Sequence, residues 1–249
     1  MVCETFSGLD SFVCRLDGRL RIVAAVALSA MIAVSSRTPA LCVALAAGVT
    51  LVVAARVPAR PVLKRLLSLN VLMGLLAVLL PVTTPGEALF RVGPVACSRA
   101  GLVLAAAVAV KANAIVLVLT ALLSTIEPVA LGRAMGRLHV PNKLIHLYFF
   151  TVRYVDVLHH EYERLRRAMR VRGFRPGMNR HTFRSFGYLV GMLLVKSFDR
   201  SERIVAAMKC RGFQGRFYLA GHFALSRGDA AFAAAAVVLL GVLGWLQWR

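Results

Sequence analysis

A short basic pattern occurs twice in the sequence, in the same register. Its two copies are Ala168-Met169-Arg170-Val171-Arg172-Gly173-Phe174 and Ala207-Met208-Lys209-Cys210-Arg211-Gly212-Phe213. The guanidinium groups of Arg172 and Arg211 can each bind a carboxylate through two parallel hydrogen bonds. Two similar basic groups suit two similar partners, so the repeat predicts two equivalent docking tips.

Each copy has the sequence of a helix C-terminus. Good helix formers lead up to basic residues, whose charge complements the final carbonyl groups of a helix. Gly173 and Gly212 follow, at the position where a left-handed residue ends many helices, and the next Phe can fold back onto the helix end. Two ordinary helix caps are the alternative interpretation, but capping alone does not require the same seven-residue pattern twice.

The sequence contains no common motif for catalysis or for ATP hydrolysis. It has no Gly-x-x-x-x-Gly-Lys-Ser/Thr loop, no His-Glu-x-x-His and no Gly-x-Ser-x-Gly. His159-His160 makes a poor metal clamp because adjacent helical side chains point about 100° apart, and the scattered cysteines form no Cys-x-x-Cys pair. We therefore expect a non-enzyme that holds no metal or cofactor of its own.

The composition indicates a membrane protein. The 249 residues are 59% hydrophobic, yet the formal net charge is +20. A soluble protein this basic would suggest nucleic acid as a partner, but here apolar and basic residues are segregated, which favours the lipid bilayer as the environment. Five apolar stretches predict transmembrane helices in an all-α polytopic fold: residues 22–36, 38–55, 66–86, 100–126 and 230–248.

The first two stretches are short for a bilayer core that needs about 20 residues per helix, and a shallow hairpin is the alternative for them. We expect Pro81 and Pro85 to end the third stretch. Most of the 31 Lys and Arg residues fall in alternate loops. The positive-inside bias then predicts a cytoplasmic N-terminus and a C-terminus outside the cell.

Lys111 is the one ionisable residue deep in a predicted span, and Asn113 lies nearby. An intramembrane charge is expensive and points to a function. We favour a contact with another subunit, with a local bend toward the membrane surface as the alternative.

The polar region before the last span predicts two long helices, Pro141 to Arg172 and Thr182 to Arg211. At about 1.5 Å per residue each is some 45 Å long. Their apolar stripes are too narrow to span a bilayer, so we expect them to pack against each other in the cytoplasm and to cross. Gly187 and Gly191 could allow a close crossing near the start of the second helix, and a shorter helix from Pro128 to Leu138 precedes the pair.

The predicted organisation has three parts. Residues 1–126 form an N-terminal membrane domain of four spans, residues 127–227 form a cytoplasmic region of two long helices with both tips, and residues 228–249 form a C-terminal span.

With both tips placed, the chain resembles the transmembrane T component of energy-coupling factor (ECF) transporters, and within that family the cobalt/nickel (CbiQ-like) type. The family signature is two Ala-Arg-Gly-type motifs that end two long cytoplasmic coupling helices. The segments Arg137 to Leu144, Tyr148 to Glu163 and Gly191 to Gly215 are also similar to the family pattern. Thr125-Ile126-Glu127-Pro128 departs from it, because the family often has Thr-Thr-Pro there.

The resemblance implies a non-catalytic coupling subunit of an importer in the bacterial inner membrane. Its implied partners are two cytoplasmic ATPase subunits (CbiO-like), which bind ATP and magnesium, and a membrane substrate-binding subunit (CbiM-like), with a small accessory subunit (CbiN-like) as a further candidate. Likeness across residues 180–215 favours cobalt as the substrate, with nickel or a vitamin such as biotin as alternatives. The residues implied to dock the ATPases are Ala168, Met169, Arg170, Arg172, Gly173, Phe174, Ala207, Met208, Lys209, Arg211, Gly212 and Phe213.

Two functions of other classes stay open. A stand-alone secondary carrier would transport without partners, and the near absence of acidic residues from the apolar stretches argues against it. A membrane-anchored binder of nucleic acid or anionic lipid would depend steeply on salt but not on the placement of individual arginines.

Overall fold

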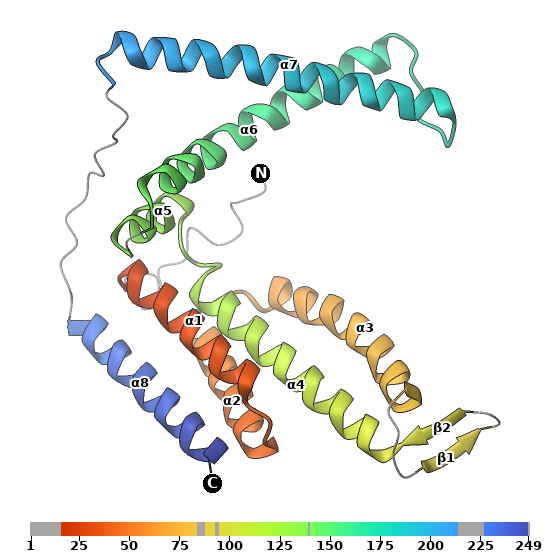
Figure 1. The fold of residues 1–249 in the computed structure, drawn as a ribbon, viewed down its shortest axis with the longest axis vertical. Coiled ribbons are helices and arrows are strands. Elements are labelled where there is room, and N and C mark those ends of the chain that lie inside the picture. The colour runs from red at the N-terminus through yellow and green to blue at the C-terminus, as the bar shows by residue number, and fades with distance from the viewer. Residues whose placement is uncertain (1–15, 84–87, 93–94, 139, 214–226, 249) are drawn as a thin grey trace. The chain divides into compact units, whose positions relative to one another are not determined.

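The computed structural model describes residues 16–83, 88–92, 95–138, 140–213 and 227–248. This part of the chain is helical apart from one short antiparallel hairpin (Figure 1). The predicted all-α polytopic fold is confirmed, whereas the hairpin was not predicted. The elements are α1 (Gly18–Val34), α2 (Thr38–Ala54), α3 (Ala59–Thr83), β1 (Ala88–Val92), β2 (Val95–Ser98), α4 (Arg99–Leu122), α5 (Pro128–Arg137), α6 (Asn142–Val171), α7 (Arg180–Cys210) and α8 (Arg227–Trp248).

Three helices in the described ranges are long and apolar enough to cross a membrane, within α3, α4 and α8. Helices α1 and α2 have 17 residues each. At about 1.5 Å per residue they reach roughly 25 Å, which is short of a hydrocarbon core of about 30 Å. Helix α3 ends at Thr83, between the two prolines expected to end it. Three of the five predicted spans therefore have full length, and α1 and α2 are the short pair.

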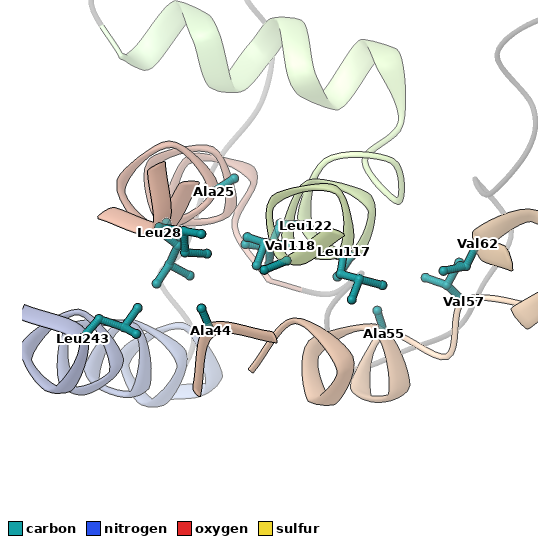
Figure 2. Packing of buried hydrophobic residues seen from close by; sticks show 14 of the residues in the cluster. Ala25, Leu28, Ala44, Ala55, Val57, Val62, Leu117, Val118, Leu122 and Leu243 are labelled. Carbon is teal, nitrogen blue, oxygen red and sulfur yellow. The ribbon is translucent and has the colours of Figure 1, made fainter. Parts of the chain in front are cut away.

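The chain forms two compact units. The first comprises Val2–Ala134 and His222–Arg249, and α4 is its central helix, in contact with α1, α2 and α3. Apolar side chains from five helices, α1, α2, α3, α4 and α8, make its core (Figure 2). Core residues seen there are Ala25 and Leu28 of α1, Ala44 of α2, Leu117, Val118 and Leu122 of α4, and Leu243 of α8.

Helices α2 and α4 approach each other closely at Gly48. A Cβ atom at this position would lie 3.0 Å from the Cβ of Leu117 and 3.4 Å from the carbonyl oxygen of Ala114. Small residues that let backbones approach are typical of helix pairs in membranes, where van der Waals contact replaces the hydrophobic effect as the driving force.

The second unit, Met135–Gly221, holds α6 and α7. These helices have 30 and 31 residues, and they cross with a contact between Glu161 and Lys196 (Figure 1). Their ends lie within two residues of the predicted ones. The predicted role of Gly187 and Gly191 is wrong, because nothing lies within 4 Å of a Cβ added at either. The bulky ring of Phe186, which contacts Phe174, fills that end of the helix pair instead.

Candidate functional site

The first tip is a complete helix cap. Helix α6 ends at Val171, and Arg172 is its C-cap residue. The amide of Phe174 donates to the carbonyl of Met169 at 3.1 Å, and the amide of Gly173 donates to the carbonyl of Arg170 at 3.0 Å. This pair of bonds is the Schellman motif, which needs a left-handed residue at its turn, and Gly173 has φ 79°.

The second tip repeats both Schellman bonds of the first. The amide of Phe213 donates to Met208 at 3.0 Å, and the amide of Gly212 donates to Lys209 at 3.0 Å. Gly212 has φ 77° and Arg211 is the C-cap residue. The predicted helix ends are confirmed, and the sequence repeat builds the same backbone shape twice.

The Met and the Phe of each copy are partly buried against the helix pair. In a Schellman motif an apolar contact commonly joins the last residue to the third residue from the helix end, which are Phe and Met here. Phe174 is half-buried, with its ring centroid 5.9 Å from that of Phe186. Phe213 and Met208 line one groove together. Capping and packing therefore explain why Met and Phe occur in both copies.

The polar half of each copy faces outward. In the described part of the chain no carboxylate pairs with Arg172 or Arg211, so both guanidinium groups are available to a partner. Capping does not account for their conservation between the two copies, which makes them the best candidates for docking. The exposed members of the two copies are Ala168, Arg170, Val171, Arg172, Gly173, Ala207, Lys209, Cys210, Arg211 and Gly212.

The two tips lie at opposite ends of the crossed helix pair (Figure 1). The C-terminal end of α6 adjoins the start of α7, as the contact of Phe174 with Phe186 shows. The C-terminal end of α7 lies beside the first half of α6, where Phe213 and Phe150 share a groove. The two tips are therefore separate features of the helix pair and do not form one continuous site.

An apolar groove of about 340 Å³ runs between the first half of α6 and the second half of α7. Tyr154 and Leu158 from the predicted stripe of α6, and Val205 and Met208 from that of α7, are among its lining residues. Beyond the groove, Glu161 of α6 pairs with Lys196 of α7. The hydrogen bond from Lys196 lowers the pKa of Glu161, so the carboxylate is ionised at neutral pH and its contact with Lys196 joins the helices where they cross.

Lys111 and Asn113 are engaged inside the chain, through two different helices. The Lys111 ammonium donates to the carbonyl of Ala33 in α1 at 2.9 Å. The Asn113 side-chain amide donates to the Asn70 side chain in α3 at 2.9 Å, and Asn70 donates back at 3.4 Å. The proposed contact of Lys111 with another subunit stays a prediction, and the structure adds a role within the chain.

Sequence reasoning missed two arginines. In the sequence, Arg21 and Arg65 are interpreted only as charges that border apolar stretches and set the membrane orientation. In the structure both bind the C-terminal end of α4. The one available signal was that each is the basic residue nearest to the start of an apolar stretch, which many topology-setting charges share.

The sequence matches the family model of CbiQ, described as a cobalt transport protein, over residues 10–219. It is also similar to proteins named energy-coupling factor transporter transmembrane protein EcfT. The relative from Listeria innocua is 27% identical over 96% of this chain and 95% of its own length. That from Heliobacterium modesticaldum is 27% identical over 83% and 82%, and that from Acidaminococcus fermentans is 24% identical over 96% and 94%. The family match spans most of the chain, and the two helix tips predict a T component. The chain therefore belongs to the CbiQ family.

Proposed function

We propose that this chain is the coupling subunit of an ATP-driven ECF importer, which passes the motion of ATPase subunits to a membrane substrate-binding subunit. One observation carries the proposal: the same cap is built twice, with Arg172 and Arg211 exposed on both. Each arginine enters an acidic groove on one of two similar ATPase subunits, where its guanidinium group binds a carboxylate through two hydrogen bonds. ATP and magnesium are bound by those subunits.

The crossed geometry supports a mechanical role. The tips lie on opposite arms of the α6–α7 pair, and Glu161 and Lys196 join the arms at the crossing. When ATP closes the ATPase pair, the separation of the two tips changes, and the angle between α6 and α7 changes with it. Shear and rigid-body rotation of packed helices are common ways to transmit such motion.

The substrate that we propose is cobalt. The description of the matching family supports it, as does the likeness over residues 180–215, with nickel or a vitamin as alternatives. The substrate is bound by the partner subunit, so none of the tip residues touches it. The proposed orientation has the N-terminus and both tips in the cytoplasm and the C-terminus outside, as the positive-inside bias requires.

The test reverses the charge at the tips. Arg172→Glu, Arg211→Glu and the double variant are co-expressed with the ATPase and substrate subunits, and ATPase co-purification and uptake of radioactive cobalt are measured. We expect membrane insertion to persist, co-purification to weaken in each single variant, and uptake to fall to background in the double variant. Arg166→Glu, an exposed reversal on α6 outside the repeat, is the matched control and should leave both readouts near wild type.

Undiminished uptake in the double variant would remove the proposal. Cobalt uptake by the purified chain alone in liposomes would instead identify a stand-alone carrier.

A further inference from the structure

Two arginines from different helices converge on the C-terminal end of α4. Nη2 of Arg21, in the first turn of α1, donates to the carbonyl of Leu122 at 2.8 Å and to the hydroxyl of Thr125. Nη1 of Arg65, in α3, donates to the hydroxyl of Ser124 at 2.8 Å and lies 3.3 Å from that of Thr120. All four acceptors lie within the last turn of α4 and the residues that follow it. We call this set of contacts the arginine clamp.

The burial of Arg21 shows that it is a built contact and not a solvated charge. Arg21 is 2% exposed, and its acceptor Thr125 is 5% exposed. Arginine is almost never this buried unless it is paired or hydrogen-bonded, because removing its charge from water is costly. The Thr125 hydroxyl in turn donates to the carbonyl of Ala121 at 2.9 Å, so the contact continues into α4.

The electrostatics of a helix end favours this arrangement. The last carbonyls of a helix have no partner inside it and carry partial negative charge. A guanidinium group donates hydrogen bonds to these carbonyls and neutralises their partial negative charge in the same contact. A charge that only sets the membrane orientation needs no hydrogen-bond acceptor within the protein. The neighbouring Arg60 and Lys64 are exposed and would suffice to set that orientation.

The segment that the arginine clamp holds is a connection between helices. Residues 123–127 join α4 to α5, and the chain then continues into α6. We propose that Arg21 and Arg65 hold this connection rigid and are positioning residues for coupling, so that force from the coupling helices reaches α1, α3 and α4 together. The rigidity is a property of the chain itself, whereas its role in coupling rests on the proposed function.

The first experiment measures the clamp alone. Amide hydrogen exchange of residues 123–127 is followed in the purified full-length chain in lipid nanodiscs. Arg65→Ala should fold, because Arg65 is exposed, and Arg21→Lys keeps the buried charge but loses the fork. We expect exchange in this segment to rise at least about fivefold in each variant, as the loss of hydrogen bonds to a charged group implies. Lys64→Ala is the matched control on α3 and should leave exchange unchanged.

The second experiment places the same variants in the assembled transporter. We expect ATPase co-purification to stay at the wild-type level while cobalt uptake per ATP hydrolysed falls. Unchanged exchange overturns the clamp. Faster exchange with unchanged uptake per ATP, or with a parallel loss of co-purification, overturns its role in coupling. Failure of the tip reversals would overturn the proposed function and leave the exchange result on the clamp standing.

Discussion

The ammonium nitrogen of Lys111 lies 2.9 Å from the carbonyl oxygen of Ala33, so a charge in the middle of α4 closes the C-terminal end of α1. The side-chain amide of Gln247, from α8, donates to the next carbonyl, that of Val34, at 3.3 Å. The last carbonyls of a helix lack internal partners, and inside a membrane water cannot satisfy them. Two polar side chains thus complete a helix that is short for a bilayer, which gives the intramembrane lysine a structural reason.

Replacement of Lys111 by Leu is expected to destabilise the protein, because the carbonyl of Ala33 loses its donor in an apolar setting. The loss should be about 1–3 kcal/mol, as for other buried groups left without a hydrogen bond. Thermal unfolding of the purified protein in detergent measures it. Lys64→Leu, on the exposed face of α3, is the control, and equal midpoints for the two variants would rule out the capping role.

The amide pair between Asn70 and Asn113 makes a prediction that depends on double substitution. Asn113→Leu alone should lower stability by about 1 kcal/mol, since Asn70 then loses its partner. Replacing both residues by Leu should recover most of that loss, because no polar group is left unpaired. A double-mutant cycle in thermal unfolding provides the measurement, and strictly additive losses would contradict the interpretation.

A side chain at either left-handed glycine of the tips should strain the backbone. Gly173→Ala and Gly212→Ala should each strain the cap by about 1 kcal/mol and weaken ATPase co-purification, because the Arg that precedes each glycine is displaced. Gly187→Ala is the matched control: it lies within α7 with open space around it, and alanine is the better helix former. If the tip variants co-purified with the ATPase as well as this control does, the result would contradict the role of the cap.

Arg56 presents the opposite case. It has φ 50° at the end of α2, and its amide donates to the carbonyl of Val53 at 3.0 Å in a cap of the same kind. Arg56→Gly should therefore raise the unfolding midpoint, with a net gain of about 0.5 kcal/mol after the entropy of the unfolded glycine is counted. Lys64→Gly, at an exposed position inside α3, should lower it by about 1 kcal/mol. The prediction fails if both variants shift the midpoint in the same direction.

The Glu161–Lys196 pair predicts a pH dependence of stability. The hydrogen bond from Lys196 lowers the pKa of Glu161 below its ordinary value of 4.5. The pair therefore stabilises the fold at pH values above 4.5, and this stabilisation is lost as the pH falls from there through the lowered pKa. We expect the difference in unfolding midpoint between wild type and Lys196→Met to shrink over this window.

The control for this experiment is Lys209→Met, which removes an exposed cation from the same helix. A wild-type-to-Lys196→Met difference that stays constant on acidification would show that the pair contributes nothing through its charge.

Local sequence signals predicted much of the fold. Pro128 and Pro141 marked the starts of α5 and α6 within one residue, and Gly173 and Gly212 marked the ends of α6 and α7. These signals work because a cap is made by residues that are neighbours in the chain. The tips of the candidate site were predictable for the same reason.

Contacts between distant segments were not predictable in this way. The acceptors of Arg21 lie about a hundred residues away along the chain. The acceptor of Lys111 lies on α1, and those of Arg65 lie at and just beyond the C-terminal end of α4. A single sequence shows that a charge borders an apolar stretch but not which helix end will meet it. The expected crossing at Gly187 and Gly191 was wrong because small residues permit close approach without requiring it.

Each tip closes its two Schellman bonds within six consecutive residues. Its shape is therefore local information, independent of the long helix that carries it and of the rest of the polypeptide. The membrane portion could therefore change in length or composition without altering the shape of either tip, and the six residues could be transplanted onto the end of an unrelated helix.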